Sequence, residues 1–177
     1  MTAAEPTTTD RPTLHLARWT VTSGSNVQSR GAVVIDAGDH HWRASAEGNG
    51  AVDALFKAVD AALADVLEGH PRLVGYDVHA LAENSEAEGL VIVAVQPPAG
   101  AEGARATGLY NGKARSTNII AASIEAYIEA LNALLAEDHW AGAAESAGAT
   151  KRRGGTEHHG RRGELDKDAD DSLPWVG

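Results

Sequence analysis

Two short segments combine glycine with small polar residues at points where the chain is predicted to enter a helix. One spans residues 47–55 and contains Gly48-Asn49-Gly50, and the other spans residues 111–123 and contains Ser116-Thr117-Asn118. A helix N-terminus carries unpaired backbone N–H groups and a partial positive charge, which favour a bound carboxylate. Glycine beside it lets a ligand approach the backbone closely. Both segments are therefore candidate ligand sites, and the alternative is that they are only tight turns and helix caps.

The other groups that could do chemistry match no catalytic or metal-binding pattern. Residues 108–114 resemble a phosphate-binding loop, but too few residues separate the glycines, and Ala114 stands where Ser or Thr must follow the lysine. In the pairs His40-His41 and His158-His159, neighbouring side chains of an extended chain point to opposite sides, so neither pair is expected to hold a metal. The sequence contains no Cys and no G-x-S-x-G motif. We therefore predict no catalytic residues, no metal and no cofactor.

Length, composition and charge narrow the function further. The chain has 177 residues, of which 43% are hydrophobic and 23% charged, which is typical of one globular domain with terminal extensions. Its net charge of -10 falls within residues 1–150, so we expect no nucleic-acid binding, which requires clustered Lys and Arg. The longest apolar run, residues 90–95, is too short to span a membrane. Because the N-terminal residues do not read as a secretory signal, we expect a cytoplasmic protein.

Periodic apolar patterns divide the chain into one folded domain and two extensions. Residues 13–140 carry the patterns of a folded domain. Residues 1–12 contain too little apolar surface to fold, and residues 141–177 are rich in Gly, His and charge, so both are predicted to be disordered.

Within the domain, three strands and a helix are predicted twice over. Residues 112–116 are predicted to break the chain before the second helix, with Ser116 or Thr117 as its N-cap. The two helices align at an offset of 68, which pairs Phe56 with Ile124. This duplication predicts an α+β fold of βββα units with pseudo-twofold symmetry, in which two antiparallel sheets pack with two helices. The predicted strands are 14–22, 31–36, 41–47, 73–82, 89–96 and 105–110, and the predicted helices are 51–68 and 117–137.

Three segments in this order resemble the C-terminal regulatory (allosteric, LeuA-dimer) domain of 2-isopropylmalate synthase. They are Gly48-Asn49-Gly50-x-Val52-Asp53-Ala54-Leu55, Leu73-Val74-x-Tyr76-x-Val78-His79-Ala80 and Ser116-Thr117-Asn118-Ile119-Ile120-Ala121-Ala122-Ser123. The resemblance covers residues 13–137. It implies a duplicated βββα domain that forms a homodimer and binds the end-product amino acid near the dimer interface.

The resemblance also implies which residues bind the amino acid. Apolar members suit a branched side chain, whereas Asn49, Asp53 and backbone N–H groups suit the polar end of the ligand. Leucine is the first candidate effector, and isoleucine is the second because the related citramalate synthases carry a similar domain. The implied effector-binding residues are Asn49, Val52, Asp53, Leu73, Tyr76, Ala80, Ala87, Arg115, Ser116 and Thr117.

Two functions remain open at this point. The first is a regulatory module of leucine biosynthesis that binds a branched-chain amino acid and acts on a separate synthase catalytic subunit. The family's metal-dependent catalytic barrel has no counterpart in this sequence, so we expect no synthase activity from this chain alone. The alternative is a structural or interaction homodimer that kept the fold but lost the effector pocket. Arg115 favours this alternative, because the family usually has a small or apolar residue there.

Overall fold

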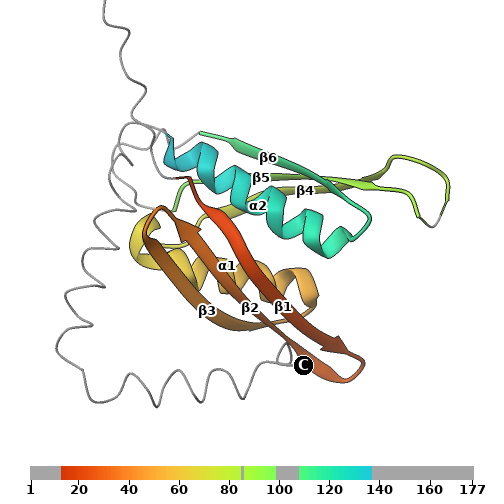
Figure 1. Ribbon diagram of the computed structural model, residues 1–177, viewed down its shortest axis with the longest axis horizontal. Helices are drawn as coiled ribbons and strands as arrows, with labels where there is room; N and C mark the ends of the chain where they lie inside the picture. Colours follow the sequence, from red (N-terminus) through yellow and green to blue (C-terminus); the bar gives the residue numbers. More distant parts are fainter. Residues whose placement is uncertain (1–12, 85, 99–107, 137–177) are drawn as a thin grey trace, which may run out of the picture.

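The computed structural model describes residues 13–84, 86–98 and 108–136. The predictions of disorder for residues 1–12 and 141–177 lie outside these ranges, and the domain boundary at residue 140 stays a prediction. The described residues form eight elements (Figure 1). They are β1 (His15–Gly24), β2 (Val27–Ala37), β3 (His40–Gly48), α1 (Ala51–Leu67), β4 (Arg72–Ala80), β5 (Gly89–Gln96), β6 (Tyr110–Ser116) and α2 (Ile119–Leu135).

The strands form two antiparallel sheets, in the orders β1-β2-β3 and β4-β5-β6. Tight hairpins join the strands of the first sheet, and each hairpin places one residue in the left-handed region, Asn26 at φ 61° and Gly38 at φ 58°. Each helix follows the third strand of its sheet and packs on the second and third strands. The predicted α+β fold with duplicated βββα units is confirmed.

The duplication extends to fine details of the two repeats. Each helix has 17 residues, and both ends of α2 lie 68 positions after the ends of α1. The same offset relates buried Trp42 of β3 to buried Tyr110 of β6. The first strand of each sheet has a bulge at the same height, directly after Leu16 in β1 and after Leu73 in β4. The repeats therefore share local irregularities as well as element order.

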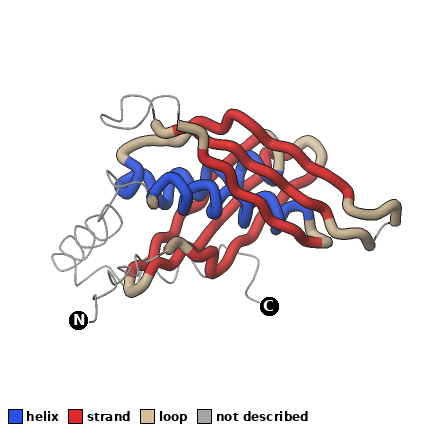
Figure 2. Tube along the Cα trace, turned by 90° about the horizontal axis from the view of Figure 1, so that it is seen from above, coloured by secondary structure: helices blue, strands red, loops and turns tan. Residues whose placement is uncertain are grey.

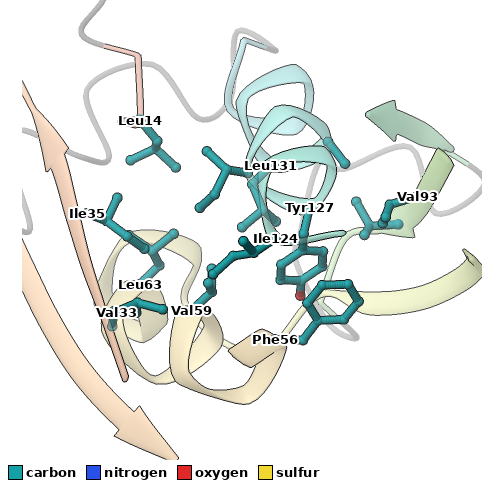
Figure 3. Close-up of a cluster of buried hydrophobic side chains, with 14 of the residues drawn as sticks. Leu14, Val33, Ile35, Phe56, Val59, Leu63, Val93, Ile124, Tyr127 and Leu131 are labelled. Atoms are coloured by element: carbon teal, nitrogen blue, oxygen red, sulfur yellow. The ribbon is translucent and has the colours of Figure 1, made fainter. Parts of the chain in front are cut away.

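The two helices form a layer between the two sheets (Figures 1 and 2). They run in the same direction and touch where Phe56 and Asp60 of α1 meet Tyr127 of α2. Both sheets and both helices contribute to one hydrophobic cluster (Figure 3), in which Ile35, Val59 and their neighbours are buried. Each repeat thus buries its apolar residues against the other, as the pattern of two incomplete units predicts.

The first strands of the two repeats are covered unequally. Asn132 of α2 accepts a hydrogen bond from the Leu14 N–H at 2.8 Å and donates one to the Leu14 carbonyl at 2.9 Å, which ties the start of β1 to α2. Along β1, Leu16 and Trp19 are half-buried. In β4, every residue except the half-buried Gly75 is exposed. The helix-facing side of β1 is therefore partly covered, whereas that of β4 is open.

The third strand of the second repeat differs from its prediction. The predicted strand 105–110 lies partly outside the described residues, and the strand found, β6, includes residues 112–116, which were expected to break the chain. Position 112 of this strand requires glycine, because a side chain there would overlap the backbone of Ala126 and Ala130 on α2. Its glycine marks a close approach of helix and strand, not a turn.

Candidate functional site

The turn Gly48-Asn49-Gly50 joins β3 to α1 and is closed by Asp53 in the first turn of the helix. Asp53 Oδ2 accepts hydrogen bonds from Lys57 Nζ at 2.8 Å and from the Asn49 N–H at 2.9 Å. These two bonds, with that of Lys57 the larger cause, lower the pKa of Asp53, so its carboxylate is charged at neutral pH. A side chain at Gly48 would overlap the backbone of Ala54, which explains the first glycine.

The two helix N-termini differ in how their first N–H groups are satisfied. Asn118 caps α2, and its side chain accepts hydrogen bonds from two first-turn N–H groups at 3.0 and 3.3 Å. The prediction of Ser116 or Thr117 as this cap is wrong, because β6 continues to Ser116, which instead accepts from the Asn118 N–H at 3.0 Å. Gly50 caps α1 and provides no side-chain hydrogen bond. Of the two helices, α1 is therefore better suited to offer its N–H groups to an anion.

Three predicted site residues, Leu73, Tyr76 and Ala80, lie along β4 on the side of the sheet that faces the helices. Their partners on β5 are all buried on that side, and the bulge after Leu73 keeps its side chain there as well. Because α2 packs on β5 and β6, β4 extends beyond its cover. Leu73 is 47% exposed and Tyr76 is 39% exposed, and Val78, which lies between Tyr76 and Ala80, is 44% exposed. We call Leu73, Tyr76, Val78 and Ala80 the β4 face.

Tyr76 is held at two points beside this open surface. Its ring lies edge-on to Phe56 of α1, with centroids 6.1 Å apart, and its hydroxyl lies 2.8 Å from Ser123 Oγ of α2. Ser123 donates its own proton to the Ile119 carbonyl at 2.6 Å, so the Tyr76 hydroxyl is the donor to Ser123. Phe56 lies one helical turn beyond Val52, so its contact with Tyr76 places the first turn of α1 beside the β4 face.

Sequence reasoning missed Phe56 and Ser123 as members of this site. Ser123 is buried, with 1% of its surface exposed, although it is a polar residue within the apolar part of α2. A buried hydroxyl requires a partner, and this was the signal that could have pointed to Tyr76. Phe56 gave no comparable signal, because an aromatic residue in a helical stripe reads as ordinary core.

The residues predicted at the end of β6 lie on both sides of the second sheet. Ser116 pairs with Gly89, and Gly89 pairs with Ala80, so Ser116 and Ala80 share one row on the helix-facing side. Arg115 pairs with Leu90 in the neighbouring row and is exposed on the opposite side. The structure therefore brings Ser116 towards the β4 face and separates Arg115 from it.

The other three predicted residues come from the start of α1, the junction of β6 and α2, and the turn between β4 and β5. Both helices begin at the right of Figure 1, and the β4–β5 turn projects beyond them at the same end. Val52 is half-buried against the core, and Thr117 is exposed between β6 and α2. Ala87 is half-buried in the β4–β5 turn, where its N–H donates to the Asn84 carbonyl at 3.2 Å. This end of the molecule thus combines both helix N-termini with the end of β4.

The described residues contain no group of three or more His, Asp or Glu side chains arranged to hold a metal ion. His41, from one of the adjacent pairs, lies with its Nδ1 2.6 Å from Asp36 Oδ1. Over the same ranges, no helix has the length and apolar character needed to cross a membrane. The contact between Phe56 and Tyr76 links α1 to the β4 face, and the charged Asp53 lies one helical turn before Phe56 on α1.

Comparisons with known proteins point to one family. The family model of the LeuA allosteric (dimerisation) domain matches residues 2–135. A 2-isopropylmalate synthase of Salinibacter ruber is 31% identical over 135 residues, which cover 76% of this chain and 22% of the relative. A second, from Sediminispirochaeta smaragdinae, is 42% identical over 89 residues, or 50% of this chain and 15% of the relative. A protein assigned as an (R)-citramalate synthase of Methanoculleus marisnigri is 33% identical over 128 residues, or 72% and 24%. The chain therefore spans less than a quarter of the length of these relatives.

Proposed function

Because the chain belongs to the family of LeuA allosteric (dimerisation) domains, we propose that it is a regulatory homodimer that binds a branched-chain amino acid. The proposed site lies between the first turn of α1 and the β4 face. Leucine is the first candidate, since relatives named 2-isopropylmalate synthase tie the family to leucine biosynthesis, and isoleucine is the second. The observation that carries the proposal is the position of Tyr76, which belongs to an exposed apolar strand and contacts Phe56, one helical turn beyond Val52 in α1.

Each part of an amino acid has a matching group at this site. The first-turn N–H groups of α1, which lack a side-chain cap, suit the carboxylate. Asp53, whose carboxylate is charged, suits the ammonium group. Leu73, Val78 and the ring of Tyr76 supply apolar surface for a branched side chain. Arg115 lies on the other side of the sheet and is not part of the site proposed here.

The β4 face also supports the dimer. Its large apolar residues are exposed, whereas Leu16 and Trp19, which occupy the equivalent places on β1, are half-buried by the chain's own helices. An exposed apolar surface of this kind indicates a binding partner. A second copy that covers β4 would complete the second repeat as α2 completes the first, and it would also enclose the amino acid.

A thermal-shift screen of the twenty amino acids at millimolar concentration tests the effector. L-Leucine or L-isoleucine should raise the melting temperature, because a ligand at one hundred times its Kd stabilises the native state by about 2.7 kcal/mol. D-Leucine is the control for recognition of the polar end. A Tyr76→Ala variant should lose the shift, and His79→Ala, on the opposite side of the same strand, should keep it. A wild-type dimer that responds to no branched-chain amino acid would instead support the purely structural homodimer.

A further inference from the structure

Five side chains from α1, α2 and β4 form a connected cluster that begins at Tyr76 of the β4 face and continues between the helices. The Tyr127 hydroxyl donates to Asp60 Oδ1 at 2.5 Å, and the Tyr127 ring stacks on Phe56 with centroids 4.4 Å apart and planes at 20°. Phe56 in turn forms a T-shaped pair with the Tyr76 ring, with centroids 6.1 Å apart, and the Tyr76 hydroxyl donates to Ser123 Oγ at 2.8 Å. The contacts therefore run from Asp60 to the side chain at the centre of the proposed site.

Tyr127 is held by α1 in two ways at once. Phe56 and Asp60 are one helical turn apart on α1, and they contact the ring and the hydroxyl of Tyr127 respectively. The stack alone would let the ring of Tyr127 slide over Phe56, because offset stacking tolerates a range of positions. The hydrogen bond to Asp60 fixes one end of the ring, and the fixed ring then limits where Phe56 and Tyr76 lie.

The duplication shows that the fold does not require a polar pair at this place. At the offset of 68, Asp60 corresponds to Ile128 and Tyr127 corresponds to Val59. Both counterparts are buried apolar residues of the same core. The symmetry-equivalent place thus has one aliphatic side chain from each helix, and a carboxylate and a phenol cost desolvation free energy by comparison, so a role beyond core packing is indicated.

We propose that Asp60 and Tyr127 are positioning residues for the amino-acid site, and that their hydrogen bond holds Phe56 and Tyr76 in the geometry that binds the ligand. This inference rests on the proposed function. Burial raises the pKa of the Tyr127 hydroxyl above its ordinary value, so the phenol keeps its proton and remains the donor to Asp60. Asn at position 60 could still accept this proton, whereas Phe at position 127 could not donate one.

The sequence provides a probe that needs no ligand. Phe56 is the only phenylalanine among the 177 residues, so a chain labelled with 4-fluorophenylalanine gives one ¹⁹F resonance that reports its position. The full-length chain is compared as wild type, Tyr127→Phe, Asp60→Asn and Tyr110→Phe. Tyr110 is the matched control, because it is also buried but lies on β6 and is not one of the five clustered residues. Leucine and isoleucine are then titrated into each variant.

Tyr127→Phe should displace or broaden the ¹⁹F resonance and weaken branched-chain amino-acid binding about tenfold, which corresponds to about 1.4 kcal/mol. Asp60→Asn should keep both the ¹⁹F resonance and the amino-acid affinity close to wild type. Tyr110→Phe should leave the resonance unmoved. An unchanged resonance in Tyr127→Phe, or an equal loss of affinity in Tyr110→Phe, would overturn the positioning role. A wild-type chain that binds no branched-chain amino acid would overturn the proposed function, and the ¹⁹F resonance would still decide whether the hydrogen bond positions Phe56.

Discussion

Asp60 is an acidic residue inside the apolar stripe of α1, and its surroundings make the stability of the fold depend on pH. Burial raises the pKa of its carboxyl above the ordinary 3.8 and outweighs the hydrogen bond from Tyr127 and the nearby His70, which both act to lower it. The folded chain therefore binds this proton more tightly than the unfolded chain. The stabilisation from protonated Asp60 is fully present below the unfolded pKa and is lost as the pH rises through the raised folded pKa.

Asp60→Asn should remove this pH dependence. As the pH rises from 3.8 through the raised pKa of Asp60, the free energy of unfolding of wild type should fall relative to that of the variant, and the difference should then level off. Urea denaturation followed by circular dichroism at a series of pH values measures it. Asp65→Asn, on the exposed side of the same helix, controls for the loss of a negative charge from α1. If the unfolding free energy of wild type stayed constant or rose with pH relative to that of Asp60→Asn, this would contradict the assigned environment of Asp60.

At the scale of elements, the spacing between each helix and its sheet is set by glycine in the strands. Gly31 of β2 lies against the backbone of Ala54 on α1, as Gly112 of β6 lies against Ala126 on α2. Without a side chain at these positions, the helix backbone approaches the sheet directly. The short distance allows α1 and α2 to share one layer and brings Tyr127 against Phe56.

Gly112→Ala should destabilise the domain strongly. The added methyl group would overlap the backbone of two helical residues, which cannot move as a flexible side chain can, so we expect a loss of about 3 kcal/mol or more. Gly50→Ala is the matched control, because no atom lies within 4 Å of the added group and its φ of -163° suits any residue. That change should cost no more than about 1 kcal/mol. Similar melting temperatures for the two variants would contradict the close packing of α2 on β6.

The helices and strands could be predicted from sequence wherever the apolar residues followed one clear pattern. The apolar stripes located both helices to within two residues, and the run 89–96 located β5 at the correct residues. The prediction failed at Gly112, because a glycine required by close packing looks the same in sequence as a glycine in a turn. Ser123 and Asp60 were missed because their partners, Tyr76 and Tyr127, are distant in the chain and meet only in the folded domain.

At the scale of the whole molecule, the exposed surface of β4 should determine the oligomeric state. Wild type should be a dimer at micromolar concentration in light scattering. Val78→Asp should give a monomer, because it would place a charge in the apolar contact between the two copies. Val78 is 44% exposed in the single chain, so the change should cost the fold itself little. His79→Asp, on the opposite side of β4, should remain a dimer. A dimeric Val78→Asp variant would exclude the β4 face as the interface.

The unequal covering of β1 and β4 bears on how many surfaces one copy of the chain offers to other copies. A duplicated chain that exposed both first strands equally would present two docking surfaces, and molecules with two such surfaces can link into open-ended filaments. Here Asn132 of α2 ties down the segment that leads into β1, and the residues of β1 that correspond to the β4 face are half-buried. Of these two equivalent surfaces of the described residues, the β4 face is the more exposed, so we expect self-association through it to stop at two copies. Partial cover of one of its two equivalent strands is therefore expected to make the duplicated fold form pairs and not filaments.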